Sequence, residues 1–294
     1  MRLLVCFSLV LVSLPTYAQD FGWWNTTHNW DGYSPWRSYL TLAPGGMGPN
    51  ALPVPDVQNG RLLTTPTLQL AGEAHFGDGD ATQNAFLDLH LPLFSDRVTL
   101  RASYVPLEYY RMTPATRDAR AARDFDARGW ASGDLYLATH IQLLRDHARL
   151  PDVLLTINLR TASGNRLTAA RFTDTPGYFF DVSVGKTFAT GSVVDSLRPH
   201  ALAGFYVWQT HAADHYQNDA VLYGLGLDML IGSLTLTPAL GGYTGYLGDG
   251  DRPLVARLSL QTTAARRVNF LARFQYGIYD FPFTSVRIGT SIKL

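Results

Sequence analysis

The sequence predicts an all-β chain, an antiparallel up-and-down β-barrel of about twelve strands. Apolar and polar residues alternate with a period of two in twelve segments between residues 61 and 294. Successive side chains of a strand point to opposite faces of the sheet, so each segment has one apolar and one polar face. The connections alternate between tight turns and long loops, which is typical of strands that each pair with the next.

Composition excludes three other classes of protein. Charged residues make up 16% of the chain and hydrophobic residues 46%, whereas a disordered chain needs high charge and low hydrophobicity. Basic and acidic side chains both number 24, which excludes a generically basic nucleic-acid binder. A single cysteine excludes a disulfide scaffold.

Residues 1–18 have the features of a secretory signal peptide. Arg2 supplies the positive start, Leu3–Leu14 is an apolar run interrupted by two serines, and Thr16-Tyr17-Ala18 offers a small-residue cleavage site. The run is shorter than the roughly 20 residues that a membrane-spanning helix needs. We therefore expect an exported mature chain without cysteine, because Cys6 lies within the signal.

Residues 19–60 form a second unit, rich in Trp, Pro and Gly. Pro and Gly at this density exclude a regular helix or a central strand. We expect an irregular segment that plugs or gates a barrel lumen, docks a periplasmic or surface partner, or packs against the start of the first strand. In the plug interpretation, four of its side chains meet arginines of the lumen by stacking and ion pairing. These are Trp30, Asp31, Tyr33 and Trp36.

The third unit, residues 61–294, contains the strands. Five segments begin near residues 68, 85, 98, 135 and 153, and seven more lie at roughly 177–188, 199–209, 219–230, 234–246, 253–262, 267–279 and 283–294. Segment 199–209 is ambiguous, because both of its phases carry apolar residues. Thr113-Pro114 and the Ala/Arg run up to Gly129 predict a short helix in the first long loop, residues 105–131.

Three observations indicate that the apolar face points outward into lipid. Aromatic residues gather on that face near the long-loop ends of the strands, where rings prefer the boundary between hydrocarbon and headgroups. An even number of strands returns both ends of an exported barrel to the periplasm, and the sequence ends within its last strand at Leu294. The expected interface aromatics are Tyr104, Tyr178, Trp208, Tyr223, Tyr246 and Tyr276.

On these grounds residues 61–294 resemble single-chain bacterial outer-membrane β-barrels of the porin-like class. Such chains often end in Phe, whereas this one ends in Leu294. The resemblance implies a location in the outer membrane of a Gram-negative envelope, among lipid and lipopolysaccharide, and transport of small polar solutes. It identifies no family within the class, so no functional residues are carried over. The alternative fold is a secreted or periplasmic β-protein with its apolar face buried between sheets.

The polar face places charged residues in the predicted lumen. Arg257, Arg273 and Arg287 come from three consecutive strands and form one basic wall, while the acids lie mostly on earlier strands. Opposed walls of this kind impose a transverse field on a water-filled pore. The competing interpretation is a closed lumen in which the charges pair and only hold the barrel in shape. The other predicted lumen residues are Arg101, Arg160, Asp88, Asp134 and Asp181.

The sequence therefore favours a channel for small polar or anionic solutes, with no cofactor and no metal. One alternative is a non-conducting barrel that anchors an envelope assembly through residues 19–60. The other is an outer-membrane hydrolase, for which Asp88 and His90 on the polar face are a weak candidate pair. The sequence contains no Walker loop, zinc-ligand spacing or dinucleotide-binding fingerprint.

Overall fold

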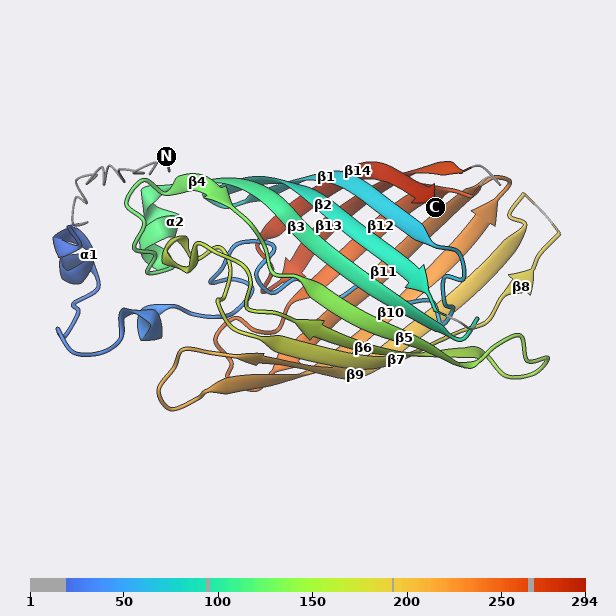
Figure 1. Ribbon diagram of the computed structural model, residues 1–294, viewed down its shortest axis with the longest axis horizontal. Coiled ribbons are helices and arrows are strands. Elements are labelled where there is room, and N and C mark those ends of the chain that lie inside the picture. The colour runs from blue at the N-terminus through green and yellow to red at the C-terminus, as the bar shows by residue number, and fades with distance from the viewer. Residues whose placement is uncertain (1–19, 94–95, 192, 264–266) are drawn as a thin grey trace, which may run out of the picture.

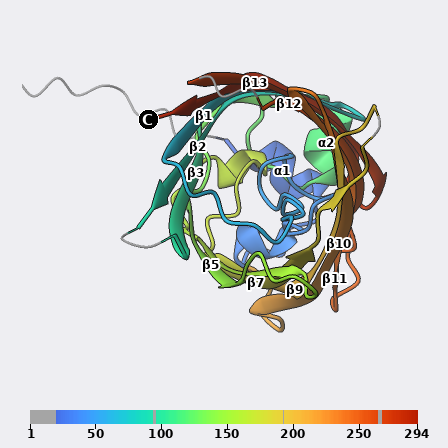
Figure 2. The same cartoon turned by 90° about the vertical axis from the view of Figure 1, so that its right-hand side faces the viewer.

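The structure is a computed structural model that describes residues 20–93, 96–191, 193–263 and 267–294. Within these residues the chain forms a β-barrel, seen from the side in Figure 1 and along its axis in Figure 2. The predicted signal peptide, residues 1–18, lies outside the described part of the chain and stays a prediction.

Twelve long strands make up the described barrel wall. They are β1 (Thr67–Gly77), β2 (Asp80–Pro92), β3 (Val98–Met112), β5 (Tyr136–Leu144), β6 (Asp152–Arg160), β7 (Gly177–Gly185), β9 (Ser196–Gln209), β10 (Gln217–Ile231), β11 (Leu234–Gly245), β12 (Leu254–Thr262), β13 (Val268–Tyr279) and β14 (Phe283–Lys293). Each pairs antiparallel with the next, and β14 pairs with β1. This last ladder closes the barrel, so the predicted twelve-stranded antiparallel barrel is confirmed.

The remaining described elements are short. Strand β4 (Arg128–Ala131) extends the pairing of β3, and β8 (Phe188–Ala189) pairs with β9. Helix α1 (Gly22–Thr27), helix α2 (Pro114–Ala119) and the 3-10 turns Trp36–Tyr39 and Leu167–Ala169 complete the set. In the described residues, no helix has both the length and the apolar character needed to cross a membrane.

Helix α2 begins where the sequence predicts and ends earlier. The Thr113 side chain accepts a hydrogen bond from the Thr116 backbone N–H, and Pro114 occupies the first helical position. The prediction that the helix continues towards Gly129 is wrong. The chain turns at Ala121, which has a φ of 51°, and then enters β4.

The apolar face of the wall points outward, as predicted. Leu137, Leu258 and Ile288 are 44%, 46% and 66% exposed, whereas the alternating residues His140 and Arg257 are buried. A soluble sandwich buries its apolar stripe, so this arrangement is the reverse of that alternative and typical of outer-membrane barrels.

One predicted interface aromatic lies on the wrong face. Trp208 is fully buried inside the barrel, where its indole N–H donates to the Leu42 carbonyl at 2.9 Å. Segment 199–209 is apolar on both faces because its inner face packs against the N-terminal segment. Among the other predicted aromatics, Tyr104 is partly buried and four are exposed. The four are Tyr178, Tyr223, Tyr246 and Tyr276.

The N-terminal segment runs through the barrel. Figure 2 shows residues before β1 inside the ring of strands, and Figure 1 places α1 beyond the end that carries α2. From there the chain crosses the lumen, and its Leu63 carbonyl accepts a hydrogen bond from Thr99 near the tight-turn end. We call residues 40–63 the luminal segment and residues 20–39 the outer segment.

A substitution of Trp208 tests whether its side chain lies on the luminal face or on the lipid face of the wall. We expect Trp208→Ala to lower the free energy of unfolding by about 3–5 kcal/mol, because it removes a large, fully enclosed side chain. Urea unfolding in lipid vesicles measures this. The matched control Tyr276→Ala removes an aromatic residue that is 54% exposed on the outer face and should cost clearly less. Equal losses in the two variants would contradict the luminal placement.

Candidate functional site

The candidate site is the occupied lumen, and its electrostatic centre is a group of three arginines. Arg257, Arg273 and Arg287 come from β12, β13 and β14, and Arg273 lies directly opposite Arg287 in the β13–β14 ladder. Adjacent antiparallel strands bring inward-facing residues side by side, so the predicted basic wall exists as a geometric feature. Like charges opposite one another repel, and this arrangement therefore requires acids close by.

Two carboxylates neutralise the arginines. Asp56 of the luminal segment lies 2.7 Å from Arg273 and 3.7 Å from Arg257, measured between its Oδ1 and their Nη1 atoms. Glu73 of β1 binds Arg287 and lies 3.8 Å from Arg273. Neither acid is among the predicted site residues. The sequence holds one signal for Asp56, which is the single acidic residue between Asp31 and Glu73.

Donors of the wall also hold the backbone of the luminal segment. Arg257 donates to the carbonyls of Val54 and Pro55, at 2.5 and 2.8 Å. Arg160 donates to the Ala51 carbonyl at 2.7 Å, and the Tyr243 hydroxyl to the Leu52 carbonyl at 3.0 Å. Proline lacks an N–H, so the prolines in this stretch bring carbonyl acceptors into the lumen without donors that would need partners.

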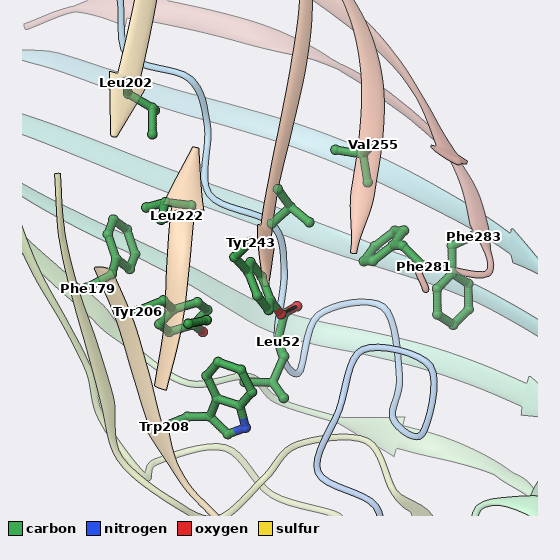
Figure 3. Close-up of a cluster of buried hydrophobic side chains, with 12 residues drawn as sticks. Leu52, Phe179, Leu202, Tyr206, Trp208, Leu222, Tyr243, Val255, Phe281 and Phe283 are labelled. Atoms are coloured by element: carbon green, nitrogen blue, oxygen red, sulfur yellow. Dashed lines mark hydrogen bonds between the residues drawn. The ribbon is translucent and has the colours of Figure 1, made fainter. Parts of the chain in front are cut away.

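An apolar cluster fixes the same stretch of chain against the wall. Figure 3 shows Leu52 beside Trp208 and Tyr243, and Val54 belongs to the same cluster of buried side chains. A methyl group added at Gly224 would lie 2.6 Å from a methyl carbon of Val57, so this glycine lets the segment lie flat on the strands. The alternation of apolar and polar residues predicts a polar inner face, so this apolar cluster was not predicted.

Polar contacts anchor the luminal segment where it leaves the lumen near the tight turns. Arg61 pairs with Asp152 at 2.7 Å, and Arg198 of β9 binds the same carboxylate at 2.8 Å. The Asn59 side chain donates to Asp228 at 2.8 Å. The segment is therefore held at this end as well as at its centre.

At the other end of the barrel, buried side chains of loops and strands form a network of ion pairs. Arg171, from the long loop after β6, is fully buried and pairs with Asp80 at 2.7 Å and with Glu108 at 2.8 Å. Arg120 binds the same Asp80 at 2.6 Å, and Asn50 of the luminal segment donates to Glu108 at 2.7 Å. Sequence reasoning did not find this network, since most of its members come from loops or strand ends.

The four side chains predicted to plug the lumen lie in the outer segment instead. Trp30 donates to Ser34, Asp31 accepts hydrogen bonds from Tyr33 and Ser34, and Tyr33 is 92% exposed. Trp36 lies near Arg123, a loop residue, with 5.3 Å between the guanidinium carbon and the ring centroid. Trp36 also packs against a buried cluster that includes Leu42 and Met47 of the luminal segment. The contacts described for these four side chains are thus local, with a loop or with the luminal segment, and the prediction that they bind luminal arginines is wrong.

The remaining predicted lumen residues are buried or partly buried on the inner face. Arg101 holds Asp88 through two hydrogen bonds of 2.8 and 2.9 Å, and His90 lies 3.3 Å from the same carboxylate. Asp134 accepts the Gly164 N–H at 2.6 Å, and Asp181 is buried on β7. Arg101 engages both oxygens of Asp88, so the carboxylate of the weak hydrolase candidate is held in an ion pair. In the described chain no three His, Cys, Asp or Glu residues gather as metal ligands.

Comparisons with known proteins identify the fold. No family model matches the sequence, and no curated protein matches it. The chain is similar to the COG4313 outer membrane channel from Pseudomonas putida F1, with a TM-score of 0.57 and 11% identity over 82% of this chain and 99% of that one. The KdgM porin (TM-score 0.45, 10% identity, 77% and 99% covered) and the NanC porin (0.48, 12%, 77% and 100%) also match. At this identity the first match shows the fold, that of an outer-membrane β-barrel.

A substitution of Asp56 tests whether its ion pairs hold the luminal segment in place. We expect Asp56→Asn to loosen the luminal segment, because three guanidinium groups then share the single carboxylate of Glu73. Hydrogen exchange of the segment's backbone amides should become at least tenfold faster, while exchange in β12–β14 changes little. The control Asp31→Asn removes an exposed carboxylate outside the lumen and should leave these rates unchanged. Unaltered exchange in Asp56→Asn would show that the ion pairs do not hold the segment.

Proposed function

We propose that the protein is an outer-membrane channel for small polar or anionic solutes and that the luminal segment acts as its plug. The observation that carries the proposal is the way this segment is bound. It forms no strand with the wall, and wall side chains hold its carbonyls and Asp56. Such contacts can break without disturbing the hydrogen bonds between the strands. The segment can therefore move while the ring of paired strands stays intact.

Displacement of the plug would change the charge of the lumen. With the segment in place, Asp56 neutralises the arginines of β12–β14. Without it, three guanidinium groups face the lumen against Glu73 alone. A narrow passage lined by one sign of charge attracts counter-ions, so the open state favours anionic solutes.

A second candidate function is surface docking through the outer segment. Residues 20–39 lie at the end of the barrel that carries the long loops (Figure 1), and Tyr33 is 92% exposed there. If the long loops face the outside of the cell, this position favours a surface partner over a periplasmic one. Export by residues 1–18 and a location among lipid and lipopolysaccharide belong to the same proposal.

A reversible crosslink tests the plug. Val57 contacts the wall at Gly241, where an added Cβ would lie 3.1 Å from a Val57 methyl carbon. We expect the double variant Val57→Cys/Gly241→Cys to form a disulfide that abolishes discrete conductance steps in planar bilayers, and reduction to restore them. Each single variant is the matched control, since neither can form the bond.

Two results would contradict the plug. The first is equal conductance in the oxidised and reduced double variant. The second is a protein that conducts no ions even when residues 40–60 are deleted, which would favour the non-conducting barrel.

The position of the outer segment is testable in whole cells. The predicted mature chain lacks cysteine, so an introduced cysteine is the single labelling site. We expect Tyr33→Cys to react with a membrane-impermeant maleimide on intact cells. Ser233→Cys, in the tight turn between β10 and β11, should react only after the outer membrane is permeabilised. The opposite pattern would reverse the proposed orientation.

A further inference from the structure

Two arginines lie side by side on the outer face of the barrel, near the end that carries α2 (Figure 1). Arg111 of β3 and Arg128 of β4 are register partners in the β3–β4 ladder, and both are exposed. Tyr110 and Met112, which alternate with Arg111 along β3, are buried on the inner face. Both arginines therefore point away from the lumen, towards the surroundings of the wall.

No acid of the described chain balances this pair. In the residues that the structure describes, neither arginine side chain forms an ion pair or a hydrogen bond. Arginines of the neighbouring loops are paired, Arg117 with Asp118 at 2.7 Å and Arg166 with Asp124 at 3.8 Å. Like charges directly opposite one another on adjacent strands repel. The pair is thus a concentrated positive charge that is open to an anion from outside the chain.

Two aromatic rings adjoin the arginines on the same face. Tyr109 and Trp130 are the next register partners towards the middle of the barrel on this face, and their ring centroids lie 4.9 Å apart. Both side chains are exposed. Such rings prefer the boundary between hydrocarbon and headgroups, so they mark the edge of the apolar layer on this side of the barrel.

Strand geometry places the arginines just beyond that edge. Leu100, Leu107 and Tyr109 are exposed on the outer face of β3. At about 3.4 Å per residue and a tilt of about 40°, the stretch from Leu100 to Tyr109 rises about 23 Å, close to the roughly 25 Å of an outer-membrane apolar band. Arg111 lies about 5 Å further along the membrane normal. The headgroup layer of a leaflet is about 5–7 Å deep, so the arginines lie within it.

The ribbon that carries the arginines is fixed from the inside. Tyr110 and Ala131 belong to a cluster of buried side chains that also contains Phe172. The Tyr110 hydroxyl donates to Asp124 at 3.2 Å. The two guanidinium groups therefore project from a backbone that is already ordered, which lowers the cost of binding a ligand between them.

We propose that Arg111 and Arg128 bind a phosphate group of lipid A, the membrane anchor of lipopolysaccharide, while its acyl chains pack beside Tyr109 and Trp130. Guanidinium groups bind phosphate through paired, charge-assisted hydrogen bonds. Lipopolysaccharide lies in the outer leaflet, so the choice of lipid A over a phospholipid rests on the proposed orientation, with the long loops outside the cell. The site does not depend on whether the barrel conducts.

Lipid binding to the purified mature protein in detergent tests the proposal. The probes are diphosphoryl lipid A, phosphate-free lipid A with the same sugars and acyl chains, and phosphatidylglycerol, and native mass spectrometry gives their relative affinities. We expect diphosphoryl lipid A to bind at least tenfold more tightly than the phosphate-free form. Equal affinities of these two forms would overturn the phosphate site. Phosphatidylglycerol that binds as tightly as diphosphoryl lipid A would overturn the assignment to lipid A.

Matched variants locate the site. We expect Arg111→Gln/Arg128→Gln to weaken the binding of diphosphoryl lipid A at least tenfold. Without lipid A its urea midpoint should stay the same or rise, because directly opposed like charges are removed, whereas a lower midpoint would indicate a structural role instead. The control Arg37→Gln/Arg252→Gln removes the same charge from two other exposed arginines and should leave the affinity unchanged.

Equal losses of affinity in the two double variants would overturn the assignment to Arg111 and Arg128. These readouts need neither a conducting channel nor a known orientation in the membrane. Failure of the plug hypothesis, or a reversed orientation, is therefore recognised separately from failure of the lipid site.

Discussion

Three guanidinium groups side by side in a narrow space must be neutralised, and the arrangement inside this barrel follows from that need. A barrel that shows its apolar face to lipid has to turn its charged side chains inward. Consecutive strands then bring Arg257, Arg273 and Arg287 together, and the wall supplies one nearby carboxylate, Glu73. Asp56 is the second, and it lies on a segment that is not part of the wall. The lumen therefore completes its charge balance only when the chain's own N-terminal region is inside.

The luminal segment has the form of a peptide bound by the wall rather than of a strand that belongs to the wall. A regular strand inside the lumen would need a ladder partner along its whole length. The extended, proline-containing stretch offers carbonyl groups that arginine and tyrosine side chains can hold one by one. Its apolar side chains fill the gap between Trp208, Tyr243 and their neighbours (Figure 3). The result is an interface like that between a protein and a peptide ligand, with both partners on one chain.

The sequence predicts the wall well and the contents of the lumen poorly, for a physical reason. Alternation reports which face of a strand meets an apolar environment, and the strands repeat this signal twelve times, so the barrel could be recognised. Alternation carries no information on what fills the interior, and an irregular segment has no period of its own. For this reason Trp208 was assigned to lipid, although its apolar surroundings are the segment itself, and the plug contacts were assigned to residues 30–36. The lone acid at position 56 was the one usable signal. The buried Arg171–Asp80–Glu108 network joins a loop to two strands, and such long-range pairs cannot be read from one sequence.

The course of the chain also constrains how the barrel is assembled. Strand β1 starts at the tight-turn end of the barrel. The residues before it come from the opposite end and pass through the lumen, so the chain runs through the barrel before it forms the first strand of the wall. Pulling the aromatic outer segment through a finished ring would require every luminal contact to be bypassed in turn. If β14 pairs with β1 in the last step of folding, the wall instead forms around the luminal segment, which already lies along its inner face. The pairing of β1 with β14 then completes the wall and encloses the luminal segment in the same step.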